Sequence, residues 1–378
     1  MKQPHKIGVA FVLYRNDPNP LYYQLSERIK AQIESGEIKV GDKLPSESEM
    51  VESYGIGRLT VRNALSRLVN AGYLRKIHGK GTFCIASSLA AKKLNIDVIL
   101  DMAYTYFVPY YIKGTSKVLT EHNCNFIISD SRDDSVRICE ILEEILQKGS
   151  SGIIVEPSHR CGTVSDRLRE AFRRLRAAGI PYIMIDSRYE GIETSYTMLD
   201  EQKGGSLAAQ YFHELGHTNM AVVYMDQYKD SLLRQQGFTE KCAALGLEKP
   251  LLIPCGPDLE AHLVKKVYGS QISALFCYND EVALESMHYI KKAGIRIPDE
   301  ISIIGFDDTV LASAVEPSLT SIAHPKQVLG EMAARALLDL IHQKRPWPYI
   351  NIFEPQLVKR NSCGKKTDKQ RLFSKLKF

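Results

Sequence analysis

The chain has 378 residues, of which 44% are hydrophobic and 25% charged, and its net charge is +5. This composition is typical of soluble globular proteins, and the length favours two or three domains. No apolar run approaches the roughly 20 residues that a membrane span needs, and the first twenty residues lack the cleavage site of a secretory signal.

Cysteine usage and charge distribution indicate where the protein acts and what it binds. The eight cysteines are scattered singly, which favours reduced thiols in a cytoplasmic protein. Residues 1–90 hold 13 Lys and Arg against 8 Asp and Glu, and residues 359–378 hold 8 against 1. The part between them is net acidic. A basic end joined to an acidic body suggests a polyanionic partner for that end.

Three helices are predicted in the first eighty residues. Apolar residues recur at every fourth position from Leu21 to Ile33, which predicts an amphipathic helix that ends near Gly36. Ser46 and Glu49 have the spacing of a capping box at the start of a second helix. A third helix is predicted from residue 58 to just before residue 72, and two short strands around HGKG then form a wing. Two short helices joined by a Gly-containing turn, the second one basic, indicate a winged helix-turn-helix.

The apolar face of the third helix determines which of its side chains point outward. Guanidinium groups there can contact guanine or phosphate, and hydroxyl and amide groups can reach base edges. A three-helix interaction module with a solvated face is the alternative, and HGKGTF lacks the spacing of a phosphate-binding loop. The outward side chains are Arg58, Thr60, Arg62, Asn63 and Ser66, and Lys80 lies between two glycines of the wing.

Residues 19–84 resemble the winged-helix domain of GntR-type transcription regulators. The resemblance rests on the P-L-Y-x-Q start, the L-P-S-E segment, the T-V-R-x-A-L core and the G-x-G-T-F wing. Ser48 stands where many members have a DNA-contacting arginine, and Gly57 stands where Ser or Thr is usual, so no operator sequence is carried over. The expected DNA-binding residues are Arg58, Thr60, Arg62, Asn63, Ser48, Gly79 and Lys80.

The rest of the chain alternates short apolar runs with longer helical patterns. This predicts a parallel α/β fold with two Rossmann-like lobes. The expected domains are a DNA-binding domain at 1–84, a linker at 85–95, an effector-binding and dimerisation domain at 96–364, and a basic tail at 365–378. The predicted strands are residues 96–100, 124–129, 152–157, 181–186, 219–225, 274–279 and 301–307.

Polar residues end several of these predicted strands. Ligands of open parallel sheets bind beyond the carboxyl ends of the strands. Several carboxylates and an amide at one cleft suit a polyhydroxylated, uncharged ligand. Each of these residues could instead cap the following helix, and paired acids also fit a glycosidase. The residues are Glu156, Asp186, Asn279, Asp307 and Asp308.

The body resembles the periplasmic-binding-protein-like effector domain of LacI-type repressors in LGHTNMAVVY, RQQGF, YNDEVAL and IIGFDDT. The joined head and body, with GIIVEP, LDEQKGG and HPKQVLG, are most similar to the arabinose-repressor family of Gram-positive bacteria. The resemblance implies Arg234, Asn279 and Asp307 as ligand contacts. The full expected effector site is Tyr106, Tyr110, Glu156, Asp186, Arg234, Asn279 and Asp307.

The function implied by the resemblance is a cytoplasmic, homodimeric repressor of carbohydrate-utilisation genes. A sugar, with L-arabinose as the leading candidate, would release it from a palindromic operator in double-stranded DNA. No cofactor, catalytic residue or metal is expected. The rival hypothesis is a carbohydrate-binding or carbohydrate-hydrolysing protein with an incidental basic N-terminal module.

One motif argues for an enzyme. Residues His213 to His217 match the H-E-x-x-H pattern, in which two histidines on one helical face bind zinc and the glutamate activates water. Gly216, however, is predicted to end the helix in the left-handed conformation, which would turn the two imidazoles apart. The sequence also offers no third ligand in a supporting motif. We therefore predict no zinc site.

Overall fold

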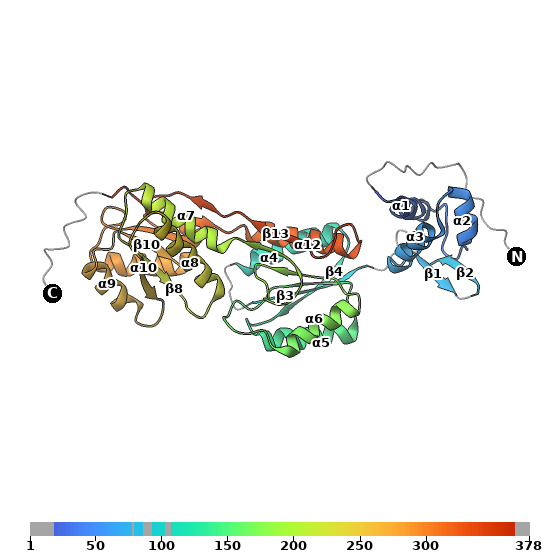
Figure 1. Ribbon diagram of the computed structural model, residues 1–378, viewed down its shortest axis with the longest axis horizontal. Helices are drawn as coiled ribbons and strands as arrows, with labels where there is room; N and C mark the ends of the chain where they lie inside the picture. Colours follow the sequence, from blue (N-terminus) through green and yellow to red (C-terminus); the bar gives the residue numbers. More distant parts are fainter. Residues whose placement is uncertain (1–18, 78, 86–92, 103–106, 367–378) are drawn as a thin grey trace. The chain divides into compact units, whose positions relative to one another are not determined.

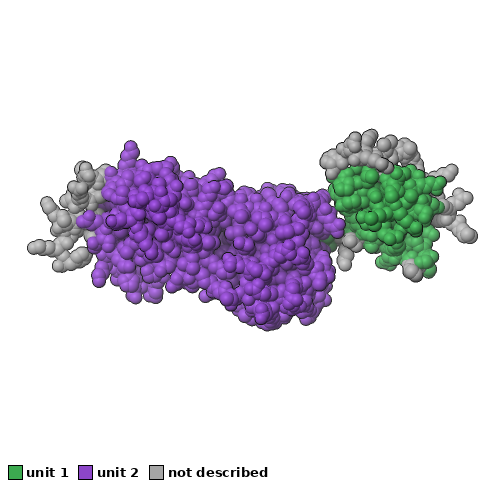
Figure 2. All heavy atoms as spheres, in the orientation of Figure 1, with its two compact units in different colours: residues 1–94 green, residues 95–378 purple. Residues whose placement is uncertain are grey.

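The computed structural model describes residues 19–77, 79–85, 93–102 and 107–366. The chain divides into two compact units, Met1–Leu94 and Asn95–Phe378 (Figure 2). Residues 86–92 of the predicted linker and Tyr106 of the predicted effector site lie outside the described residues. No helix in the described part of the chain is long and apolar enough to cross a membrane.

The first unit is a winged helix-turn-helix, as predicted (Figure 1). The Ser46 hydroxyl accepts a hydrogen bond from the Glu49 amide at 3.2 Å, and the Glu49 carboxylate accepts one from the Ser46 amide at 2.6 Å, so the predicted capping box is confirmed. Two antiparallel strands form the wing. The elements are α1 (Leu21–Glu34), α2 (Glu47–Tyr54), α3 (Arg58–Asn70), β1 (Leu74–Ile77) and β2 (Gly81–Cys84).

The core of the first unit is built from the apolar faces that the sequence predicts. Helix α1 packs against α3, and Leu25, Ile29 and Val61 are almost fully buried between them. Burial of one face of α3 leaves its opposite face to solvent, where Arg62 and Asn63 are exposed.

The second unit contains two sheets of six strands, and we call each sheet with its covering helices a lobe. Lobe 1 has the strand order β13–β7–β6–β5–β3–β4, and lobe 2 has β14–β12–β11–β10–β8–β9. All neighbouring strands are parallel except β12 and β14, so the predicted parallel α/β fold is confirmed. The lobe 1 strands are β3 (Asn95–Leu100), β4 (Asn125–Asp130), β5 (Gly152–Val155), β6 (Tyr182–Ile185), β7 (Ser195–Leu199) and β13 (Ile350–Phe353). The lobe 2 strands are β8 (Met220–Tyr224), β9 (Leu251–Pro254), β10 (Ala274–Cys277), β11 (Ser302–Asp307), β12 (Thr320–Ala323) and β14 (Gln356–Val358).

Helices cover both sheets, and one of them changes lobe. Helix α12 follows β12 of lobe 2 but packs against α4, β5 and β6 of lobe 1. Lobe 1 carries α4 (Val108–Glu121), α5 (Ser135–Lys148), α6 (Asp166–Ala177) and α12 (Lys326–Ile341). Lobe 2 carries α7 (Glu201–Glu214), α8 (Lys229–Ala244), α9 (Leu259–Gly269), α10 (Asp280–Lys292) and α11 (Val310–Ala314).

The chain passes between the lobes at three crossovers: from β7 to α7, from β12 to α12, and from β13 to β14. These crossovers bring residues that are distant in sequence to the junction of the lobes. The seven predicted strands are all present, as β3, β4, β5, β6, β8, β10 and β11. The apolar runs of the sequence did not predict β7, β9, β12, β13 and β14.

Candidate functional site

The exposed face of α3 carries cations that share one acidic partner. Glu47 of α2 pairs with Arg58 at 3.5 Å, with Arg62 at 3.3 Å and with Lys76 of the wing at 2.9 Å. The hydrogen bond from Lys76 holds the pKa of Glu47 below its usual range. Helix α2, helix α3 and the wing are therefore tied together at one cationic surface.

The other predicted DNA-binding residues also lie at or near the surface of the first unit. Ser48, Asn63 and Lys80 are exposed, and Thr60 is half-buried. Gly79 has a φ of +71°, a left-handed conformation that favours glycine in the turn of the wing. Their contact with DNA stays a prediction.

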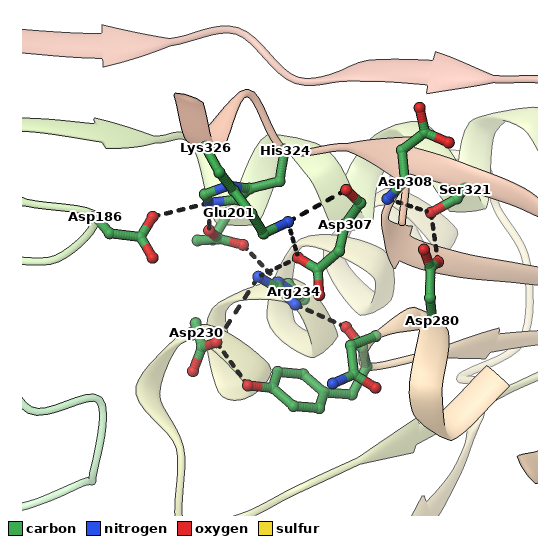
Figure 3. Close-up of polar contacts among 12 residues, drawn as sticks. Asp186, Glu201, Asp230, Arg234, Asp280, Asp307, Asp308, Ser321, His324 and Lys326 are labelled. Atoms are coloured by element: carbon green, nitrogen blue, oxygen red, sulfur yellow. Dashed lines mark hydrogen bonds and ion pairs between the residues drawn. The ribbon is translucent and has the colours of Figure 1, made fainter. Parts of the chain in front are cut away.

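The second unit contains a cavity between its lobes, at the carboxyl ends of the strands (Figure 3). The space between its walls is about 670 Å³, part of which is open solvent. Aromatic and charged side chains alternate around its wall. The lining residues are Phe107, Tyr111, His159, Asp186, Met225, Tyr228, Asp230, Arg234, Tyr278, Asn279, Glu281, Val282, Asp307, His324 and Lys326.

Arg234 is held in this cavity from several sides. It is 4% exposed, and its Nη1 donates a hydrogen bond to the Tyr278 carbonyl oxygen at 2.8 Å. Its Nε lies 2.5 Å from a carboxylate oxygen of Glu201. Its guanidinium stacks over the Phe306 ring, 3.6 Å from the ring centroid. These contacts fix the direction in which the remaining guanidinium nitrogen points.

Two glycines make the approach of Arg234 to Glu201 possible. Helices α7 and α8 cross at Gly205 and Gly237, where an added Cβ would lie 1.9 Å and 1.8 Å from backbone oxygens of the opposite helix. Any larger residue would force the helices apart. The second glycine of the LDEQKGG motif, Gly205, thus acts in helix packing, and this packing brings Glu201 of α7 and Arg234 of α8 together beside the cavity.

A charge network lies along and behind the cavity wall, and we define it as eight side chains in which acidic and basic groups alternate. It begins at Glu156 in lobe 1, passes through the crossover before α12 and ends at Lys326, the first residue of α12. Figure 3 shows its members from Asp186 to Lys326. The successive N···O distances are Glu156–His159 3.3 Å, His159–Asp186 3.9 Å, Asp186–His324 2.8 Å, His324–Glu201 3.7 Å, Glu201–Arg234 2.5 Å, Arg234–Asp307 4.0 Å and Asp307–Lys326 3.1 Å.

The network controls the charge of its members. Burial alone would raise the pKa of Asp186, but the charges of His324 and His159 outweigh this and hold that pKa well below its usual range. Burial raises the pKa of Glu201, and the charge of Arg234 opposes the rise. Most charges at the site are neutralised by one another, which suits an uncharged ligand.

His159 is expected to give the second unit a pH-dependent stability. Burial would lower the pKa of its imidazole, but the hydrogen bond to Glu156 and the charges of Asp230, Glu156 and Asp186 raise the pKa to about 10. A raised pKa stabilises the folded state below the unfolded value of about 6.5, and this stabilisation is lost as pH rises toward the folded value. We expect the free energy of unfolding to fall between about pH 7 and pH 10, and His159→Gln to flatten this dependence. Denaturant titrations of both proteins across this range measure it, and equal slopes would contradict the assignment.

Two cavity residues have strained backbones. Asp186 has a φ of +66° and Asp307 a φ of +103°, both in the region that favours glycine. Such conformations cost about 1–3 kcal/mol each and are concentrated at functional sites. Asp186 directly follows β6 and Asp307 ends β11, and both carboxylates point into the cavity (Figure 3). This supports a ligand site at this position.

The structure brings four of the predicted effector residues together, namely Asp186, Arg234, Asn279 and Asp307. Asn279 also caps α10, because its side-chain oxygen accepts a hydrogen bond from the Val282 amide at 2.9 Å. The capping alternative therefore describes part of what Asn279 does. The Asp307 carboxylate pairs with Lys326 at 3.1 Å.

Two other predicted residues lie away from the cavity surface. Glu156 is almost fully buried behind His159, and it accepts a hydrogen bond from the Asp101 amide at 2.8 Å. It acts on the cavity through His159. Tyr110 is 38% exposed and does not line the cavity, whereas the next residue, Tyr111, does.

Several lining residues were not predicted from the sequence. His324 and Lys326 flank Pro325 in HPKQVLG, a motif that carried the family resemblance but received no site residue. They come from a crossover, where no strand-end pattern pointed to a ligand. Tyr228 and Tyr278 lie parallel, with ring centroids 6.3 Å apart. Tyr228 follows the predicted strand 219–225 and Tyr278 lies near the end of the predicted strand 274–279, so a search for aromatic residues at strand ends would have found them.

Comparison with known proteins agrees with both units. The chain matches the family model of bacterial regulatory proteins of the gntR family at residues 21–84 and that of a periplasmic binding protein-like domain at residues 209–363. Two arabinose metabolism transcriptional repressors, from Geobacillus stearothermophilus and Halalkalibacterium halodurans, are each 30% identical to it. The alignments cover 91% of this chain and 97% and 96% of those proteins. The chain belongs to this family of transcriptional repressors.

Solved structures agree with the fold of this repressor. A LacI family transcriptional regulator from Enterococcus faecalis with bound ribose is 28% identical, with a TM-score of 0.61 over 72% of this chain and all of that one. A regulator of the same family from Enterococcus faecium, also with bound ribose, gives a TM-score of 0.61 at 24% identity. The relatives are regulators and not enzymes, so the repressor is a DNA-binding regulator and the hydrolase alternative is rejected.

The H-E-x-x-H segment of the repressor has a structural explanation. Helix α7 ends at Glu214, and Gly216 has a φ of +88°, as predicted. Beyond this turn His217 is fully buried, with Nδ1 2.9 Å from the Ser273 hydroxyl and Nε2 3.0 Å from the Gly364 carbonyl oxygen. Both ring nitrogens of His217 are therefore engaged away from His213.

We expect a chelator to change neither DNA binding nor ligand binding by the repressor, because His213 and His217 do not form a metal pair. Elemental analysis of the purified protein checks this. Stoichiometric zinc that is lost in His213→Ala would contradict it.

Two groups of cavity side chains have donor atoms close enough to hold a metal ion, Glu156–His159–Asp186 and Asp186–Glu201–His324. A histidine binds a metal ion through its neutral imidazole. The raised pKa of His159 keeps that ring protonated near neutral pH. The cationic Arg234 lies against the second group. We assign these groups to the charge network.

Proposed function

We propose that the repressor acts on carbohydrate-utilisation genes and is released from its operator by a sugar bound in the cavity, with L-arabinose as the effector. The observation that carries this is the cavity itself, in which paired charges and four aromatic rings surround one space. Charged groups that neutralise one another can bond sugar hydroxyls without demanding a charged ligand. The names of the two arabinose repressors favour L-arabinose among sugars.

Aromatic and polar groups at the cavity suit the two faces of a sugar ring. Tyr111 lies in α4 and Phe107 is the residue before that helix. Tyr228 and Tyr278 come from lobe 2. Rings of this kind cover the apolar C–H face of a carbohydrate. The buried Tyr111 hydroxyl lies close enough to the Asp186 carboxylate to help lower the pKa of that carboxyl, and both side chains line the cavity. A ligand hydroxyl at this position would meet both groups.

We propose a role for each segment of the chain. We assign residues 1–84 to DNA binding, 85–95 to a linker, 96–364 to effector binding and dimerisation, and 365–378 to a basic tail. A homodimer presents two heads to the two halves of a palindromic operator. The protein acts in the cytoplasm, where its DNA is. The sugar favours the DNA-releasing form and shifts the population toward it.

A thermal-shift screen with a panel of pentoses and hexoses tests the effector. A ligand at 100 times its Kd stabilises the folded state by about 2.7 kcal/mol, so L-arabinose is expected to raise the melting temperature by several degrees. Calorimetric titration then gives the affinity. A shift with another sugar and none with L-arabinose would reject the effector but keep the sugar-responsive function.

A further inference from the structure

Two backbone hydrogen bonds join the lobes beside the cavity. The Cys161 amide donates to the Gln227 carbonyl oxygen at 2.8 Å, and the Lys229 amide donates to the His159 carbonyl oxygen at 2.9 Å. Between them, Arg160 of lobe 1 and Tyr228 of lobe 2 are antiparallel partners. We call residues 159–161 and 227–229 the clasp.

The clasp has one side at the cavity and the other at solvent. His159 and Tyr228 line the cavity, whereas Arg160, Cys161 and Gln227 are exposed. A ligand that enters on this side must pass between the two clasp segments. With both hydrogen bonds formed, this path is closed.

Each half of the clasp is held by its own lobe. In lobe 1 the Asp133 carboxylate accepts hydrogen bonds from the His159 amide and the Ser158 hydroxyl, both at 2.8 Å, and pairs with Arg160 at 3.0 Å. In lobe 2 the Ser231 hydroxyl accepts a hydrogen bond from the Met225 amide at 2.8 Å. The halves are thus formed in advance, and the two bonds between them depend on how the lobes approach each other.

His159 belongs to both the clasp and the charge network. Its carbonyl oxygen accepts the bond from Lys229, and its ring pairs with Glu156 and Asp186. Because the same residue lines the cavity, a ligand bonded to Asp186 bears directly on the segment that closes the clasp.

We propose that the clasp closes the cavity over the bound ligand and sets the lifetime of the complex, with His159 as the positioning residue that links the two. This rests on the proposed function, since it takes the cavity as the sugar site. The clasp opens for the sugar to leave, so loss of one clasp hydrogen bond shortens the residence time. DNA binding without sugar is unaffected, because the first unit is intact.

Lys229→Pro removes one clasp donor with little other change. Lys229 is the first residue of α8, a position where proline is favoured. Tyr228 has φ −115° and ψ 130°, the conformation that a residue before proline adopts. Lys229→Ala is the matched control, because it removes the same side chain and keeps the amide.

Stopped-flow measurement with L-arabinose compares the full-length variants. We expect the dissociation rate of the sugar to rise about threefold to tenfold in Lys229→Pro and less than about twofold in Lys229→Ala, as loss of one hydrogen bond implies. Equal dissociation rates in the two variants would overturn the proposal.

A second measurement needs no ligand. Antiparallel partners of the type of Arg160 and Tyr228, which exchange no backbone bond with each other, have Cα atoms about 4.5 Å apart, within disulfide range. We expect Arg160→Cys with Tyr228→Cys, in a Cys161→Ser chain, to form an intramolecular disulfide under mild oxidation, seen by peptide mass spectrometry. Failure to form it would overturn the clasp. If the wild-type chain does not bind L-arabinose, the effector assignment falls, and the disulfide alone decides the clasp.

Discussion

Asp307→Asn is expected to weaken sugar binding by about 10- to 150-fold and to leave operator binding intact, so that the variant stays on DNA when sugar is added. The carboxylate is 7% exposed, lines the cavity and pairs with Lys326 and Arg234. A buried hydrogen bond to a charged group contributes about 1.5–3 kcal/mol, which gives this range. Asparagine keeps the size of the side chain and tolerates the positive φ of this position.

The control for this variant is the neighbouring residue. Asp308 also has a positive φ, of +50°, but its carboxylate pairs with Arg360 at 2.6 Å and does not line the cavity. Asp308→Asn is expected to keep wild-type sugar affinity. Calorimetric titration of both folded variants with L-arabinose measures the difference, and wild-type affinity in Asp307→Asn would remove Asp307 from the site.

Arg58→Ala and Arg62→Ala are each expected to lower operator affinity at least tenfold without changing sugar affinity. Both side chains are more than half exposed on α3, opposite its buried face. A lost base or phosphate contact costs about 1–3 kcal/mol, and a dimer loses it at two half-sites. Fluorescence anisotropy with a DNA duplex selected by the full-length protein from a random pool measures the loss.

Lys30→Ala is the control for these two variants, because it removes the same charge from α1, where Lys30 pairs with Glu34 at 3.8 Å. It should change operator affinity by less than threefold. A loss as large as that of Arg58→Ala would mean that net charge, and not the position on α3, determines binding.

The helices and strands that depend on local sequence patterns were predicted from the sequence. Helix α3 was predicted by its spacing of apolar residues, and seven strands of the second unit were predicted by their apolar runs, although the short apolar run of β9 was missed. Strands β7 and β12 were missed because they bury polar residues: Thr197 and Ser321, for example, are fully buried within them. Only the tertiary environment makes such segments strands.

The site residues at strand ends were predicted from the sequence. The site residues that only tertiary packing brings to the cavity were missed. Asp186 and Asp307 follow apolar strands, so both were expected at the cavity. Tyr110 and Tyr111 are adjacent on α4 and point about 100° apart, so choosing between them requires the helix orientation. His324 reaches the cavity only because the chain changes lobe before α12.

Operator release by sugar tests the central claim most directly. Full-length protein is bound to its selected duplex, and L-arabinose is titrated in, with D-glucose as the control sugar, while anisotropy is recorded. The proposed function predicts release by L-arabinose with a midpoint near the calorimetric Kd, and retention with D-glucose. A complex that stays intact at L-arabinose concentrations that saturate the protein would contradict sugar-induced release.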